Sequence, residues 1–316
     1  MFSFTKAELA AKANELNFVR DTMEKVLRLV DILDYLNVNL LTKDTLALKG
    51  GTAINLTVFN LPRLSVDLDF DYSVEQSREE MLRQRQSISE EIKIYMATQG
   101  YALSDRSKTR HSLDSFVFVY KNLGGMNDNI KIEINYSLRA HLFAPEQRLI
   151  VPGAIPGGKY ALSIQPIEIF AGKINALLNR AAARDLYDTY NMIRDGLFKE
   201  SDYDMLRKSV IFYTAISQEE IPQVYDVKRI DAITSHKIKT DLLPVIHKGE
   251  YVELENMKNT VKDFTEKLLL LTDDEKAFLK AFSEKQYKPE MLFNDSGILN
   301  RIRRHPMALW KIQERK

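Results

Sequence analysis

The sequence of 316 residues contains no cysteine. Disulfide bridges and thiolate metal sites are therefore excluded, and this composition fits a reducing compartment. No apolar run approaches the ~20 residues that are needed to span a bilayer. The first residues, MFSFTKAELAAKANEL, lack the basic and apolar regions of a secretory signal. We therefore expect a cytoplasmic protein with no membrane partner.

The sequence also lacks a large excess of positive or negative charge. It has 45 Lys and Arg residues and 44 Asp and Glu residues, so its net charge is +1. This balance argues against electrostatic capture of the whole chain by nucleic acid or by an acidic membrane, although a local basic patch is compatible with it. Apolar residues make up 45% of the sequence. The chain can therefore bury a sizeable core, and it is long enough for two domains.

Hydrophobic spacing predicts helices, then a small group of strands, then a mostly helical half. The expected elements are helices within residues 9–33, a strand at 45–48, a helix to about residue 59, a strand at 64–72, a helix at 75–98, and strands at 115–120 and 130–136. Proline and glycine cluster at 151–158, which predicts a boundary between domains 1–158 and 159–316. In the second domain, Pro166 and the capping-box sequence at Thr272 predict helix starts.

A glycine turn joins the strand at 45–48 to the helix that follows it. A strand–turn–helix arrangement directs backbone N–H groups and the positive end of a helix dipole into one small space. Glycine lets the backbone approach phosphate oxygens, and nearby hydroxyl and basic side chains add donors and positive charge. The candidate phosphate-binding residues are Lys49, Gly50, Gly51, Thr52, Arg63 and Ser65.

Carboxylates alternate with apolar residues along the next predicted strand. Asp67 and Asp69 lie two residues apart, so their side chains project from one face, about 7 Å apart along the chain. Carboxylates this close repel one another, and Mg²⁺, which prefers oxygen ligands and phosphates, relieves that repulsion. Glu133, on the polar side of the strand at 130–136, is the natural third ligand if the two strands pair. The sequence therefore predicts a Mg²⁺ site at these three residues.

Each of these motifs has an ordinary structural interpretation when it is taken alone. A D-x-D pair is usually a solvated strand edge, a G-G-T sequence is usually a turn, and Glu133 alone would be an exposed strand residue. The order of strand, glycine turn, helix and S-x-D-x-D is much more specific than any of its parts. The combination favours a site that binds a nucleotide and a metal.

The sequences KGGTAIN and LPRLSVDLDFD together resemble the signature of the AbiEii/AbiGii-type nucleotidyltransferase toxins. These are polymerase β-like enzymes of type IV toxin–antitoxin and abortive-infection systems. The resemblance implies an α+β fold, in which a polymerase β-like core of a small mixed sheet and flanking helices is followed by a helical C-terminal domain. Thr52 stands where the general pattern has Ser, and the gap to Asp67 is longer than in many relatives.

A second group of charged residues lies in the helical half, at Lys173 and in the sequence RAAARDLYD. If a single helix continues through it, the residues on one face are Lys173, Arg180, Arg184 and Asp188. Periodicity alone indicates a solvated helix with an i,i+4 ion pair between Arg184 and Asp188. The family resemblance instead implies that Lys173 binds nucleotide phosphate, that Arg180 lies at the nucleotide, and that Asp185 is a supporting catalytic residue.

The resemblance also implies a reaction, namely Mg²⁺-dependent transfer of NMP from an NTP to an RNA acceptor, expected to be the 3′ end of tRNA. Asp67 and Asp69 would hold metal, and Glu133 would also accept the proton of the attacking hydroxyl. Blocked translation would follow, relieved by a cognate antitoxin that is encoded nearby. Two alternatives stay open: a protein or small-molecule hydroxyl as acceptor, and a non-catalytic nucleotide- or RNA-binding module.

Basic residues are concentrated in the C-terminal tail, together with an aromatic residue, Trp310. The basic residues are Arg301, Arg303, Arg304, Lys311, Arg315 and Lys316. Such a tail can grip an RNA backbone or stack a base, but it is more often an amphipathic helix that docks on the body of the protein. The residues that would dock are Leu299, Ile302, Leu309 and Trp310.

Overall fold

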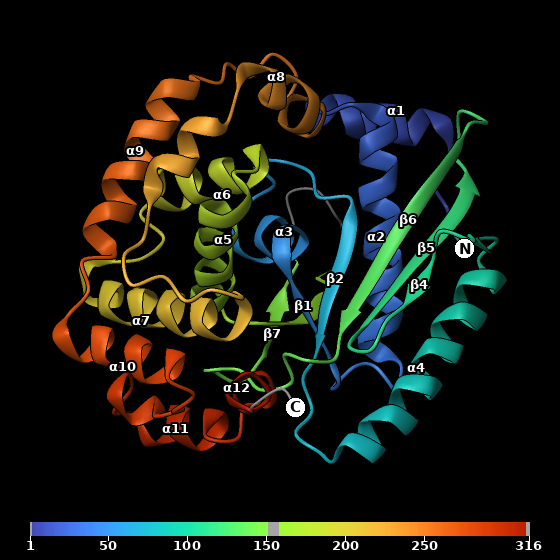
Figure 1. Cartoon of the computed structure of the whole chain (residues 1–316). Coiled ribbons are helices and arrows are strands. Elements are labelled where there is room, and N and C mark those ends of the chain that lie inside the picture. Colours follow the sequence, from blue (N-terminus) through green and yellow to red (C-terminus); the bar gives the residue numbers. More distant parts are fainter. Residues whose placement is uncertain (1, 151–157, 314–316) are drawn as a thin grey trace. The chain divides into compact units, whose positions relative to one another are not determined.

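A computed structural model describes residues 2–150 and 158–313 of the chain (Figure 1). The chain divides into two compact units. The first comprises Met1–Arg139, Pro145–Ile164 and Pro244–Glu250, and the second comprises Ala140–Ala144, Gln165–Leu243 and Tyr251–Lys316. The domain boundary predicted at 151–158 lies outside the described residues, apart from Gly158, and stays a prediction.

The first unit contains a mixed sheet with flanking helices. Its elements are α1 (Lys6–Glu15), α2 (Arg20–Val38), β1 (Leu46–Lys49), α3 (Gly50–Ala53), the π-helix η1 (Ile54–Val58), β2 (Asp67–Tyr72), α4 (Arg78–Thr98), β3 (Ala102–Leu103), β4 (Lys108–Thr109), β5 (Leu113–Lys121), β6 (Asn127–Asn135), β7 (Glu146–Leu149) and β8 (Tyr160–Ser163). The eight-stranded sheet has the order β3-β5-β6-β2-β1-β8-β7, with β4 paired to β5. Strand β2 runs parallel to β6, and β1 to β8, whereas the other neighbours are antiparallel. The predicted α+β class is confirmed.

One face of this sheet is apolar. Leu68 and Phe70 of β2 are buried, as are their register partners Ile132 and Ile134 on β6. Helix α2, which runs beside the sheet in Figure 1, packs on this face through Leu33, which lines the same small cavity as Phe70. Because alternate residues of a strand project from opposite faces, burial of this face fixes the other one as the polar face.

Strand β2 begins at Asp67 rather than at Leu64, where the alternating pattern predicted its start. The residues before it pair elsewhere. Arg63 forms an isolated antiparallel bridge with Ile246, and the N–H of Leu64 donates to the carbonyl of Val245 at 2.6 Å. A returning stretch of polypeptide therefore takes up the backbone groups that would otherwise extend the strand.

Helices make up the described secondary structure of the second unit. They are α5 (Pro166–Arg180), α6 (Ala183–Arg194), α7 (Glu200–Ser217), the 3-10 helix η2 (Val227–Ala232), α8 (Ser235–Lys237), the π-helix η3 (Ile238–Leu242), α9 (Leu254–Leu268), α10 (Asp273–Ser283), the 3-10 helix η5 (Pro289–Met291), α11 (Ser296–Ile302) and α12 (Pro306–Ile312), while the 3-10 helix η4 (Leu243–Val245) spans the return to the first unit. The helix starts predicted at Pro166 and at the Thr272 capping box are confirmed. In the described part of the chain, no helix is both long and apolar enough to cross a membrane.

The chain between Lys173 and Asp188 does not form the single helix on which the spacing argument depended. Helix α5 ends at Arg180, and the next residue, Ala181, adopts a left-handed conformation with a φ of 47°. Helix α6 then begins at Ala183. A left-handed residue interrupts the helical hydrogen-bond ladder and turns the chain, so two helices replace one.

The C-terminal tail forms two short helices rather than one. Leu299 and Ile302 of α11 are buried as expected for a docked helix. In α12, however, Leu309 is 36% exposed and Trp310 is 51% exposed. Helix α11 is therefore more deeply buried than α12. The basic residues 315 and 316 lie outside the described residues.

Candidate active site

The predicted carboxylates lie on the polar face of the sheet, on the parallel strands β2 and β6. Asp69 is in register with Glu133, and Asp67 is in register with Lys131. Register partners project from the same face of a sheet, as do residues two apart on one strand. The two strands therefore pair, as the assignment of Glu133 as third ligand required, and all three carboxylates lie on one face.

The glycine turn packs directly against the carboxylate strand. Gly50 has a φ of +67°, and a Cβ atom added to it would lie 2.8 Å from Oδ2 of Asp69. A Cβ atom on Gly51 would lie 2.6 Å from Nη2 of Arg63 and 2.9 Å from Oγ of Ser65. Real Cβ atoms essentially never approach another heavy atom within 3.0 Å. A Cβ atom at either position would therefore force these neighbouring side chains or the turn to shift, and glycine lets the backbone lie this close to β2 and to the residues before it.

Thr52 and Arg63 face into the protein, each being only 1% exposed. The hydroxyl of Thr52 donates to the backbone carbonyl of Asp67, which ties the turn to the start of β2. Nη1 of Arg63 donates to the carbonyl of Leu64 at 3.0 Å. These two side chains support the turn from inside the protein, and the contacts with phosphate that were expected of them stay predictions.

Lys131 places a positive charge among the three predicted metal ligands. Its Nζ lies 2.8 Å from Oε2 of Glu133. Burial alone would lower the pKa of Lys131, but a hydrogen bond to Glu133 and the charges of the three carboxylates raise it. These carboxylates thus already balance a cation, and they supply the hard oxygen donors that Mg²⁺ prefers. Among the described residues, no group of three or more acidic or histidine side chains is already arranged to hold a metal ion.

Asp71 is a residue of this face that the sequence motifs did not single out. It is 2% exposed, and its carboxylate lies 2.5 Å from Nζ of Lys49. Burial raises the pKa of Asp71, and the ammonium of Lys49 opposes that rise. A signal was present in the sequence, because Asp71 continues the i,i+2 spacing of Asp67 and Asp69 along β2.

Lys173, Arg180 and Asp185 belong to a separate charge cluster within the second unit. Nζ of Lys173 lies 2.9 Å from Oδ1 of Asp185 and 3.1 Å from Oδ2 of Asp188, and both acidic side chains are 1% exposed. Arg180, whose side chain is 64% exposed, contacts the other carboxylate oxygen of Asp185 at 2.8 Å. Burial alone would raise the pKa of Asp185, but the two cations lower it. Packing of α5 against α6 therefore assembles this cluster.

Removal of the Lys173 ammonium should destabilise the protein. In Lys173→Met, two buried carboxylates lose the cation they share, and we expect the free energy of unfolding to fall by about 3 kcal/mol. Arg180→Met is the matched control, because an ion pair with an exposed partner contributes no more than about 1 kcal/mol. Urea denaturation followed by circular dichroism measures both changes. Equal losses in the two variants would show that burial does not set the strength of this cluster.

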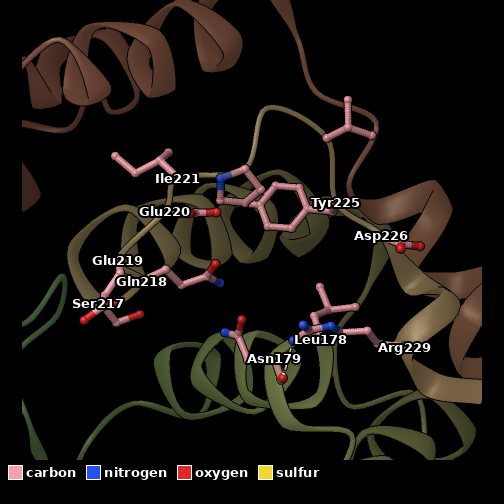
Figure 2. A pocket seen from close by; sticks show the side chains of 12 residues that line it. Leu178, Asn179, Ser217, Gln218, Glu219, Glu220, Ile221, Tyr225, Asp226 and Arg229 are labelled. Atoms are coloured by element: carbon pink, nitrogen blue, oxygen red, sulfur yellow. Dashed lines mark hydrogen bonds between the residues drawn. The ribbon is translucent and has the colours of Figure 1, made fainter. Parts of the chain in front are cut away.

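A cavity of about 730 Å³ lies within the second unit, near the C-terminal ends of α5 and α7 (Figure 2). Figure 2 shows the side chains of Asn179 and Gln218 directed into it. The charged lining residues are Glu219, Glu220, Asp226 and Arg229. The described lining includes none of the predicted phosphate- or metal-binding residues, and its excess of acidic groups disfavours a triphosphate. This cavity is therefore distinct from the predicted nucleotide site.

A mixed sheet with carboxylates beside a glycine turn is the arrangement expected of nucleotidyl-transferring enzymes. The chain belongs to the family described as nucleotidyl transferase AbiEii toxin, type IV TA system, whose family model matches residues 31–287. It is therefore a nucleotidyltransferase and a toxin of a type IV toxin–antitoxin system. The family resemblance inferred from the glycine turn and the D-x-D motif is confirmed.

Solved structures add a similarity of fold. MenT4, a nucleotidyltransferase toxin from Mycobacterium tuberculosis H37Rv, matches with a TM-score of 0.62 and 18% sequence identity, over 99% of this chain and 100% of that one. The CdnC:HORMA-deltaN complex of E. coli MS115-1 matches with a TM-score of only 0.27 and 12% identity, over 95% of this chain and 96% of that one, which is too low to indicate a shared fold. No curated protein matches the chain.

Proposed function

We propose that the enzyme transfers NMP from an NTP to the 3′-terminal hydroxyl of an RNA, with tRNA as the expected acceptor. The observation that carries this proposal is the register of Asp69 with Glu133, which sets three carboxylates on one face of the sheet. The glycine turn packs against the same strand through Gly50. Acidic oxygens suit cations and turn N–H groups suit phosphate, which are the two kinds of contact that an NTP requires.

In this proposal, Asp67, Asp69 and Glu133 would hold Mg²⁺. When bound, the metal supplies positive charge that orients the triphosphate and lowers the pKa of the attacking hydroxyl. The donor chemistry fits, since Lys131 already brings one cation among these carboxylates.

The remaining steps depend on the side chains and backbone of the protein. The carboxylate of Glu133 accepts the proton of the acceptor hydroxyl. The hydroxyl oxygen bonds to the α-phosphorus, the bond from that phosphorus to the bridging oxygen breaks, and pyrophosphate leaves with the electron pair. The N–H of Gly51 and the hydroxyl of Ser65 bind the triphosphate, and the family resemblance implies a phosphate contact for Lys173 as well. Further predicted phosphate contacts are Lys49, Gly50, Thr52 and Arg180.

The cellular consequence follows from the acceptor. An NMP added to the 3′ end of tRNA would block aminoacylation and thereby arrest translation and growth. The membership of the chain in a toxin–antitoxin family supports this consequence and implies a cognate antitoxin that relieves it.

Incubation of the purified protein with each of the four labelled NTPs and with total RNA, protein or metabolites tests the proposal. We expect label on RNA of tRNA size, at its 3′ end, and loss of the label when EDTA removes divalent metal. Label only on protein or on metabolites would overturn the RNA assignment in favour of another hydroxyl acceptor. Absence of transfer to any acceptor, with any NTP, would favour a non-catalytic binding module.

A further inference from the structure

Asp71 and Lys49 form an ion pair with one buried and one accessible member. The side chain of Asp71 is 3% exposed, whereas that of Lys49 is 26% exposed. The carboxylate is thus shielded from water, while the ammonium can still meet a ligand that arrives from solvent. A carboxylate that loses its water in this way needs a cationic partner, because the isolated charge is costly to bury.

The register of β1 and β2 explains how Lys49 reaches this carboxylate. Lys49 lies opposite Asp69, and Ala47 lies opposite Asp71. All four side chains therefore share the polar face of the sheet. Ala47 is fully buried and carries only a methyl group, so the stem of Lys49 has room to run back over it toward Asp71.

The same lysine directly precedes the glycine turn. It is the N-terminal flanking residue of α3, and the next residue, Gly50, lies against Asp69. A lysine stem has several rotatable bonds, so holding its ammonium in place beforehand reduces the entropy lost when a ligand binds. An ammonium has three hydrogens, and the pair with Asp71 leaves others for a phosphate oxygen.

We propose that Asp71 is a positioning residue that holds the ammonium of Lys49 ready for the phosphates of the nucleotide. The proposal rests on the proposed function, because the phosphates are those of the NTP. Asp71 acts only through Lys49 and contacts no substrate itself. Removal of its charge should therefore free the lysine and weaken nucleotide binding, without changing the groups that carry out the reaction.

Amine acylation followed by mass spectrometry tests whether Asp71 restrains the ammonium of Lys49. This restraint, called the tether below, is measured without reference to activity. In Asp71→Asn, which keeps the shape and removes the charge, Lys49 should be acylated about tenfold faster, the effect of losing one charge-assisted hydrogen bond. Asp128→Asn is the matched control, because Asp128 pairs with Lys25 at 2.8 Å and the side chain of Lys25 is 16% exposed. Asp71→Asn should speed the acylation of Lys49 only, and Asp128→Asn should speed that of Lys25 only. An unchanged rate at Lys49 in Asp71→Asn would overturn the tether.

Kinetics then test whether the tether serves the nucleotide. We expect the KM for NTP to rise about tenfold in Asp71→Asn with kcat much less affected, as for the loss of a contact made equally before and during the reaction. Asp128→Asn should change neither constant. An unchanged KM with a freed Lys49 would show that the pair is only structural and would overturn the proposal.

If Asp71→Asn does not fold, the wild-type protein still allows a test, which is whether bound NTP protects Lys49 from acylation. Saturating NTP should slow the acylation of Lys49 but leave that of Lys25 unchanged, and equal rates at Lys49 with and without NTP would contradict the proposal. The proposed function and the proposed role of Asp71 can fail separately. Absence of nucleotide transfer by the wild-type protein would overturn the proposed function, whereas the acylation rates of the variants decide on the tether by themselves.

Discussion

Asp69→Asn should lower the rate of nucleotidyl transfer roughly 10³-fold while the protein stays folded, and Asp67→Asn should do the same. Each substitution preserves the shape of the side chain but removes a negative charge from the face that Asp67 and Asp69 share with Glu133. Fixed charges act most strongly on the transition state, so their loss lowers kcat and kcat/KM together. Because the two residues serve one site, the double substitution should be little worse than either single one.

Incorporation of labelled NMP measures these rates, and thermal melting followed by circular dichroism verifies the fold. Asp128→Asn makes the same chemical change on β6 at a carboxylate that pairs with Lys25, and it should keep full activity. Wild-type transfer by folded Asp69→Asn would show that these carboxylates are not the catalytic site. Growth inhibition that persists undiminished when the Asp67 and Asp69 variants are expressed in cells would argue equally against the catalytic assignment.

Local patterns in the sequence predicted which face carries the candidate carboxylates better than they predicted the extent of the strand that carries them. Alternation placed Asp67 and Asp69 on one face, because the apolar residue between them has to be buried. The predicted start of β2 was wrong, because the N–H of Leu64 donates a hydrogen bond to the carbonyl of Val245, a residue far along the chain. Periodicity reports which face of a segment is buried, but it contains no information about a distant segment that competes for backbone hydrogen bonds.

The charge clusters were predictable only in part, for a related reason. Helical spacing indicated that Lys173 and Asp188 lie together, and they do, but a break at Ala181 and the packing of α5 on α6 bring them there. No glycine marks this break, and alanine is uncommon in the left-handed region. Likewise, the spacing of Asp71 was visible, whereas its burial and its pairing with Lys49 depend on the register of the sheet. Tertiary packing decides which charges pair.

Gly50→Ala should reduce nucleotidyl transfer about 10²-fold with only a modest loss of stability, because displacing a catalytic group by about 1 Å costs this much in rate. The positive φ of Gly50, +67°, costs an alanine about 1 kcal/mol. The added Cβ atom would lie 2.8 Å from Oδ2 of Asp69, so either the carboxylate or the turn has to shift. The loss of rate should therefore be much larger than the loss of stability explains.

Gly100→Ala separates the two causes, because it reproduces the backbone strain without the contact. Gly100 also has a positive φ, +82°, but a Cβ atom there would meet nothing within 4 Å. Its alanine variant should lose the same stability of about 1 kcal/mol in urea denaturation and still incorporate NMP at the wild-type rate. Gly50→Ala should differ from it in rate alone. Equal activity of the two variants would mean that catalysis does not depend on how closely the glycine turn approaches Asp69.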